Sequence, residues 1–211
     1  MSATKKYKEV IIKGDRELAK KLANEAVKNK EDINKIIDEF SEAIRHVGDL
    51  FEEGEFFLPE LMRSAEAMKG AMEILTPALS EGSKKDRIVG KVVIGTIEGD
   101  IHDIGKTLVA SILQAEGFEV FDLGADVPVD TFIEKAIEVD ADLICISALL
   151  TTTMIGQKKL IEDLKEKGIR DKFKVLIGGA PVSKNWVEEI GADGTAENAI
   201  SAVKLAKKLV S

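Results

Sequence analysis

The sequence contains a single cysteine, Cys145, so it can form no disulfide within the chain and no zinc site built from several cysteines. It has no apolar run approaching the roughly 20 residues that a membrane-spanning helix needs. Its first ten residues, MSATKKYKEV, lack the apolar core of a signal peptide, which predicts a cytoplasmic protein. Only four prolines, with many isoleucines, leucines and valines, exclude collagen-like and disordered chains.

An excess of positive charge is also absent. The 211 residues include 30 basic and 38 acidic side chains, which give a net charge of −8. We therefore expect neither nucleic acid nor a membrane among the partners of the protein. With 45% apolar and 32% charged residues, the composition is that of an ordinary globular protein of one large or two small domains.

The first part of the chain has a helical period. A short helix is expected over 5–12, ending near Gly14, and Asp15 can cap the next helix. The third and fourth helices carry clear apolar stripes, the fourth following Pro59, a good first-turn residue, and ending at Pro77. Four short, closely connected helices predict an antiparallel bundle, which we assign to residues 1–82.

Beyond a polar linker at 83–87, residues 88–211 have the pattern of an α/β domain. Short apolar runs predict strands at 89–97, 118–123, 143–147 and 173–177, with a short fifth strand at 191–195. Amphipathic helices are expected at 104–116, 130–138, 155–167, 182–190 and 197–209. Strands that are apolar on both faces and alternate with helices are typical of a parallel sheet covered on both sides. The predicted fold class is α/β, with a four-helix bundle cap followed by a flavodoxin-like (Rossmann-like) five-stranded parallel sheet domain.

The unusual residues follow the strands, at the carboxyl edge where such a sheet binds ligands. The loop after the first strand contains Gly99, Asp100, Ile101, His102, Asp103, Ile104 and Gly105. The third strand runs into Ser147, Leu149, Thr151, Thr152 and Thr153, and the fourth into Gly178, Gly179 and Ala180. Small and hydroxyl residues concentrated at one edge let the backbone approach a large ligand closely.

His102 is one of only two histidines, and Asp100 and Asp103 flank it. A carboxylate that accepts one ring proton fixes the tautomer of a histidine and makes its other nitrogen a better metal donor. The ordinary alternative for His102 is a solvated side chain, and a direct zinc or iron site of Asp100, His102 and Asp103 also stays open.

Simpler roles also exist for the other loops. Residues 151–153 could cap the following helix, and Gly178 with Gly179 could form a tight turn. A receiver domain would need an acidic residue where Ser147 stands, and a dinucleotide-binding fold would need a Gly-x-Gly-x-x-Gly loop that residues 99–105 do not supply.

The pattern Asp100-x-His102-x-x-Gly105, followed by Ser147-x-Leu149 and Gly178-Gly179, resembles the signature of cobalamin-binding domains. The intervening gaps, 41 residues over 106–146 and 28 over 150–177, match the usual spacing of that family. Residues 54–69 resemble the helical cap that precedes this domain in methionine synthase and in methyltransferase corrinoid proteins. Together these resemblances cover nearly the entire chain, which is similar to the corrinoid proteins of methylamine, methanol, betaine or methoxyaromatic methyltransferase systems.

The resemblance implies a cofactor, cobalamin or another cobamide, whose cobalt takes His102 as its lower axial ligand with Asp100 as the partner of His102. It also implies that Thr153 stands where methionine synthase completes this relay with a serine. The remaining residues implied to contact the cofactor in the α/β domain are Gly99, Ile101, Asp103, Ile104, Gly105, Ser147, Leu149, Thr151, Thr152, Gly178, Gly179, Ala180, Ala196, Glu197 and Asn198. Phe57 and Met62, in the bundle, are the candidates for the upper face of the corrinoid.

By the same resemblance the protein is a methyl carrier, a subunit without donor chemistry of its own in a multi-component methyltransferase system. It accepts a methyl group on cobalt(I) from a donor-specific methyltransferase. It then passes the group from methyl-cobalt(III) to a second methyltransferase, whose acceptor is tetrahydrofolate or coenzyme M. A reductive activation protein is a further implied partner, and the linker would let the cap swing away from the cofactor. The alternatives are a cobalamin-binding sensor or regulator subunit and a mutase small subunit.

Overall fold

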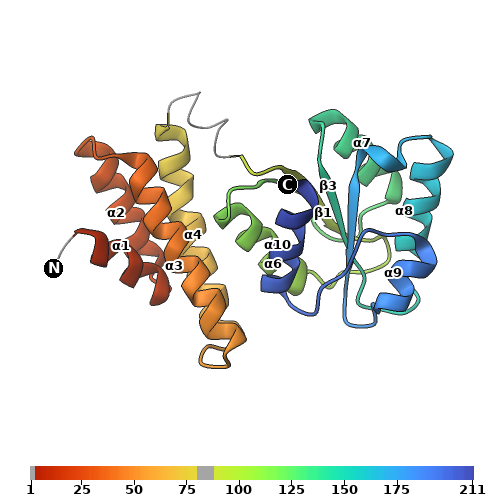
Figure 1. Ribbon diagram of the computed structural model, residues 1–211, viewed down its shortest axis with the longest axis horizontal. Coiled ribbons are helices and arrows are strands. Elements are labelled where there is room, and N and C mark those ends of the chain that lie inside the picture. The colour runs from red at the N-terminus through yellow and green to blue at the C-terminus, as the bar shows by residue number, and fades with distance from the viewer. Residues whose placement is uncertain (1–2, 80–87) are drawn as a thin grey trace. The chain divides into compact units, whose positions relative to one another are not determined.

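The computed structural model describes residues 3–79 and 88–211 (Figure 1). These residues form two compact units, one holding the four N-terminal helices and the other holding a sheet with its own helices. The linker predicted at 83–87 lies outside the described residues. Within the two described ranges, no helix combines the length and the apolar character needed to cross a bilayer.

The N-terminal unit consists of α1 (Ala3–Ile12), α2 (Arg16–Lys28), α3 (Ile33–Glu52) and α4 (Leu58–Ala78). Aspartates begin two of these helices, since Asp15 accepts from the backbone N–H of Leu18 and Asp32 from that of Lys35. The apolar stripes point inward and bury large side chains, among them Ile11, Phe40, Ile44, Leu61, Met68 and Leu75. The sequence predicted that the fourth helix ends at Pro77. In the structure Pro77 lies inside the last turn of α4, which ends at Ala78.

The second unit is built on four parallel strands in the order β2-β1-β3-β4. They are β1 (Lys91–Thr96), β2 (Glu119–Asp122), β3 (Leu143–Ser147) and β4 (Lys174–Gly178). The helices are α6 (Ile104–Ala115), α7 (Val129–Val139), α8 (Ile155–Glu166), α9 (Lys184–Ile190) and α10 (Ala199–Val210). Figure 1 shows α7 and α8 on one side of β1 and β3, and α6 and α10 on the other. This α/β architecture after a helical cap confirms the predicted fold class.

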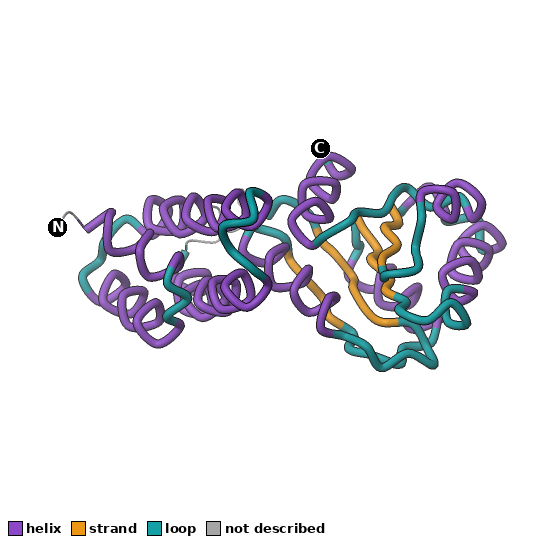
Figure 2. Tube along the Cα trace, turned by 90° about the horizontal axis from the view of Figure 1, so that it is seen from below, coloured by secondary structure: helices purple, strands orange, loops and turns teal. Residues whose placement is uncertain are grey.

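Burial explains why the strands are nearly continuous apolar runs. Val93, Ile144 and Ile146 face the helices α7 and α8, where they pack with Phe132 and Leu160 in one large core. The neighbouring strand residues point to the opposite face and are buried as well. Because all four strands are parallel, the loops that leave their carboxyl ends lie along one edge, visible in Figure 2 as the loops that join the strands to the following helices.

The fifth strand predicted at 191–195 is wrong as a strand, and among the described residues the sheet has four. Leu176 and Gly194 form only an isolated parallel bridge. The N–H of Val175, which a fifth strand would have bonded through its backbone, instead donates to Oδ2 of Asp193 at 2.7 Å. Arg170 donates to the same oxygen. Pairing beside β4 is therefore limited because a side chain has taken the place of a backbone acceptor.

Close approach between α8 and the end of β1 requires a glycine. A Cβ on Gly156 would lie 2.3 Å from Cγ1 of Ile97, which is itself buried and leads into the loop after β1. The backbone of α8 at Gly156 thus lies directly against the side chain of Ile97.

We predict that Gly156→Ala lowers the free energy of unfolding by about 1–3 kcal/mol, because the new methyl group must displace Ile97 in a packed core. Urea denaturation of the corrinoid-free chain measures this. Gly105→Ala in α6 is the matched control, since its Cβ would meet no atom within 4 Å. Equal midpoints for the two variants would contradict the prediction.

Candidate functional site

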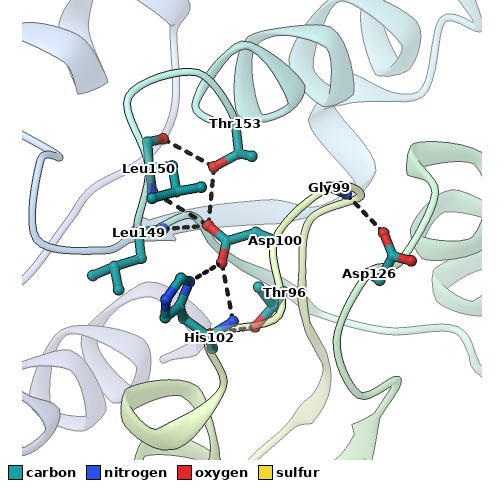
Figure 3. Close-up of polar contacts among 8 residues, drawn as sticks. All are labelled: Thr96, Gly99, Asp100, His102, Asp126, Leu149, Leu150 and Thr153. Carbon is teal, nitrogen blue, oxygen red and sulfur yellow. Dashed lines mark hydrogen bonds and ion pairs between the residues drawn. The ribbon is translucent and has the colours of Figure 1, made fainter.

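Asp100 lies in the loop between β1 and α6, and its side chain has no exposed surface. Its Oδ1 accepts from the backbone N–H of His102 at 3.0 Å and lies 2.7 Å from Nδ1 of the imidazole. Its Oδ2 accepts from the N–H of Leu149 at 2.7 Å, from that of Leu150 at 3.3 Å and from the hydroxyl of Thr153 at 2.9 Å (Figure 3). One carboxylate thereby joins the loop after β1 to the loop after β3.

The charge of Asp100 follows from these contacts. Burial raises its pKa, but the hydrogen bonds from His102, Leu149 and Thr153 outweigh that effect and hold the pKa well below the usual range. The carboxylate is therefore ionised at neutral pH and can only accept hydrogen bonds. It follows that Nδ1 of His102 carries the proton and Nε2 keeps its lone pair in the neutral ring.

The imidazole of His102 is oriented but not enclosed. The side chain keeps 51% of its surface exposed, although Nδ1 is bound by a carboxylate that has none exposed. The hydroxyl of Thr96, at the end of β1, also donates to the backbone carbonyl of His102 at 3.1 Å. Among the residues that the structure describes, no group is bonded to Nε2, so this nitrogen is available to a ligand.

Glycines leave open space along the same edge. A Cβ built on Gly105 or on Gly178 would meet no atom within 4 Å. At Gly179, by contrast, φ is 127° and a Cβ would lie 1.8 Å from the carbonyl oxygen of Ala148. Only glycine fits there, and its backbone is exposed.

Other predicted site residues are spread along this edge. Ser147, half-buried at the end of β3, pairs in register with Gly178. Leu149 is partly exposed, and the two hydrophobic residues beside His102 are strongly exposed, Ile101 at 78% and Ile104 at 67%. Exposed positions are also taken by Gly99, Asp103, Thr151, Thr152, Ala180 and Glu197, whereas Ala196 is half-buried.

Three more predicted residues either cap a helix or belong to the other unit. Asn198 caps α10 by accepting from the N–H of Ser201 at 2.8 Å. Phe57, the residue before α4, and Met62, within it, are exposed and belong to the helical unit, not to the unit that carries His102.

Two of the alternatives considered for these loops are not what the described residues show. Residue 154 stands before α8 without a side-chain cap, so the threonines at 151–153 do not cap that helix. No group of three or more His, Cys, Asp or Glu side chains is arranged to hold a metal ion in the described ranges, so the zinc or iron alternative lacks its ligand set.

Polar residues that the sequence did not reveal also support this edge. Gln157 is fully buried in α8 and donates to the carbonyls of Ile146 at 3.3 Å and Gly178 at 3.0 Å. It accepts from Nε1 of Trp186 at 3.0 Å. The available signal was a polar residue on the buried stripe of a helix. Asp126, an exposed residue in the loop between β2 and α7, also supports this edge by accepting from the N–H of Gly99 at 2.7 Å.

We predict that Asp100→Asn destabilises the corrinoid-free chain at neutral pH by at least about 2 kcal/mol, because an amide nitrogen would face hydrogen-bond donors. The pKa of Asp100 is lower in the folded chain than in the unfolded chain. Its ionised form therefore stabilises the fold above the unfolded value of about pH 4, and this contribution is lost as the pH falls below it. The difference between wild type and variant should shrink when chemical denaturation is repeated between about pH 7 and about pH 3. A difference that stays constant would contradict the proposed charge state.

Comparison with known proteins gives the same family for both units. Residues 90–204 and residues 3–76 each match a family described as a B12 binding domain. A corrinoid protein of Desulfitobacterium hafniense (strain Y51) is 48% identical over 100% of this chain and 98% of the relative. Trimethylamine corrinoid protein 2 of Methanosarcina acetivorans is 47% identical over 97% of this chain and 95% of the relative.

The fold agrees with a solved structure. The methanol:cobalamin methyltransferase complex of Methanosarcina barkeri contains a chain that is 30% identical, with a TM-score of 0.86, matched over 99% of this chain and 79% of that one. The residues observed here fit a corrinoid, since the edge that carries the oriented imidazole is also open at Gly105 and Gly178. This chain therefore belongs to the B12-binding corrinoid proteins of methyltransferase systems, and its cofactor is a cobalamin or a related corrinoid.

Proposed function

We propose that this chain is a methyl carrier that takes a methyl group from a donor-specific methyltransferase and delivers it to a second methyltransferase, with tetrahydrofolate or coenzyme M as acceptor. The observation that carries the proposal is the Asp100–His102 pair, which leaves Nε2 free on an imidazole of fixed orientation. Membership of the corrinoid family supplies the matching cofactor. When bound, the corrinoid supplies a cobalt centre that can take up and give up a methyl group.

In this proposal His102 ligates cobalt through Nε2, and Asp100 prepares it to do so. The ionised carboxylate keeps the proton on Nδ1 and holds the ring at a fixed angle. Thr153 contributes by donating to the other oxygen of Asp100. These residues thus hold one ring nitrogen against a carboxylate and leave the other nitrogen available as a ligand.

The remaining edge residues are proposed to receive the nucleotide tail of the corrinoid. Gly105 and Gly178 leave space beside the backbone, and Gly179 provides a peptide that no side chain covers. Ser147 and Leu149 are assigned to the wall of the space that would hold this tail. Ala180, Ala196, Glu197 and Asn198 lie in the loops that follow β4 and α9 and are assigned to the same ligand.

The helical unit, taken as residues 1–82 and joined by 83–87 to the domain at 88–211, is proposed to shield the upper face of the corrinoid. Phe57 and Met62 suit this role because they are apolar and keep 68% and 38% of their surface exposed. The face of a corrin ring is largely apolar, so exposed apolar side chains that cover it would remove apolar surface from water.

Two methyltransferases and a reductive activation protein are the proposed partners, with no nucleic acid and no membrane. We infer a methylamine as the methyl donor. The support is the higher identity to a corrinoid protein named for trimethylamine, 47%, than to the chain of the methanol complex, 30%.

We predict that His102→Ala retains part of the bound corrinoid but shows the absorption spectrum of a water-ligated form, with affinity reduced by at least about tenfold. Anaerobic reconstitution with hydroxocobalamin, followed by titration and a spectrum, measures both quantities. His46, the other histidine, is exposed on α3, and His46→Ala should leave both unchanged. An unaltered spectrum in His102→Ala would rule out His102 as the ligand.

We predict that methyl transfer to the loaded, reduced chain is at least about tenfold faster with a methylamine methyltransferase than with a methanol methyltransferase, a difference of about 1.4 kcal/mol in recognition. Stopped-flow absorption of the corrinoid measures the rate. The loaded His102→Ala variant serves as a control for the contribution of ligation. A faster reaction with the methanol enzyme would overturn the donor assignment, and no transfer with either class would overturn the carrier role.

A further inference from the structure

The segment between β2 and α7 supports the segment that carries Asp100 and His102. Backbone pairing continues past the ends of β1 and β2, since the N–H of Thr96 donates to the carbonyl of Gly124 at 2.9 Å and that of Val127 to Thr96 at 3.0 Å. The N–H of Glu98 donates to the carbonyl of Val127 at 2.9 Å. The loop after β1 is therefore held on one side by a paired neighbour.

Asp126 binds this loop through both its side chain and its backbone. Its Oδ1 accepts from the N–H of Gly99 at 2.7 Å, as Figure 3 shows. Its own N–H donates to the carbonyl of Asp100 at 3.0 Å. These two bonds fix the peptide before Gly99 and the peptide after Asp100, which together set the direction in which the Asp100 side chain leaves the backbone.

Both partners adopt unusual backbone conformations to make these bonds. Asp126 has φ of 57° and Gly99 has φ of 80°, in the left-handed region that most side chains avoid. Aspartate tolerates this region better than most residues, and a strained conformation persists where the surroundings fix it. Position 126 therefore requires a residue that tolerates a positive φ and also carries a side-chain acceptor.

We propose that Asp126 is a positioning residue for His102, which sets the share of bound corrinoid that is ligated through that imidazole. The inference rests on the proposed function, because it takes His102 as the cobalt ligand. Oδ1 of Asp100 holds both the backbone N–H and Nδ1 of His102, so a turn of the Asp100 peptide moves the ring by two routes. A ligating side chain needs its position fixed to within about 0.5 Å, so its supporting contacts matter for ligation.

Three variants distinguish the effect of losing the side-chain acceptor from the effects of the backbone conformation and of the charge. Asp126→Gly removes the acceptor and tolerates the positive φ, whereas Asp126→Asn keeps an acceptor oxygen and also tolerates it. Asp140→Gly is the matched control, because Asp140 stands at the other end of α7 with φ of 53°. It loses the same side chain and charge from the same kind of backbone, away from the loop after β1.

The test is the absorption spectrum of each chain loaded with hydroxocobalamin, with His102→Ala as the reference for the water-ligated form. We expect Asp126→Gly to lower the ratio of His-ligated to water-ligated corrinoid about fivefold, as for the loss of one hydrogen bond. Asp126→Asn and Asp140→Gly should stay close to wild type. In the corrinoid-free chain, amide exchange at Gly99 should be faster in Asp126→Gly alone.

The outcomes distinguish the inference from the function on which it rests. A wild-type spectrum in Asp126→Gly, or an equal loss in all three variants, would overturn the positioning role. If wild type itself gives the spectrum of His102→Ala, the proposed ligation fails instead. Thermal unfolding of the corrinoid-free chains shows whether Asp126→Gly and Asp140→Gly are destabilised to the same degree, which keeps a general loss of stability apart from a loss of ligation.

Discussion

A buried carboxylate cannot remain charged unless hydrogen-bond donors surround it, and Asp100 meets that condition with donors from two separate loops. Each donor has a structural origin. His102 follows Asp100 in the loop after β1, and Leu149, Leu150 and Thr153 follow β3. Because β1 and β3 are neighbours in a parallel sheet, the two loops meet at one edge. The charge of Asp100 in turn decides which nitrogen of the imidazole is left free, so the chemistry of the site depends on the topology of the sheet.

The same edge combines two opposite properties, fixed polar contacts and unfilled space. Around Asp100 the side chain is enclosed and every oxygen is bonded. A short distance along the edge, Gly105 and Gly178 leave room that an alanine would begin to fill. A large cofactor with one metal centre and one long tail needs both, a precise contact for the metal and free space for the tail.

Much of the fold and the chemistry could be predicted from the sequence because they depend on local patterns. The strands β1, β3 and β4 are short apolar runs, and the pairing of Asp100 with His102 follows from their spacing of two residues in one loop. The prediction of a fifth strand was wrong because the carboxylate of Asp193 accepts from the backbone N–H of Val175, eighteen residues earlier, where a strand would have offered a backbone carbonyl. Asp126 and Gln157 were missed for the same reason. Their partners, Gly99 and Gly178, lie far from them in the chain, so the local sequence does not identify which residue each side chain contacts.

Gln157 also gives the protein an intrinsic optical property. The only tryptophan in the sequence, Trp186, donates its indole N–H to this buried amide. The amide in turn donates to the carbonyl of Gly178, at the end of β4. Indole emission responds to hydrogen bonding and to the polarity around the ring. The tryptophan emission of the unlabelled chain therefore comes from a single indole, which lies two hydrogen bonds away from Gly178 at the end of β4.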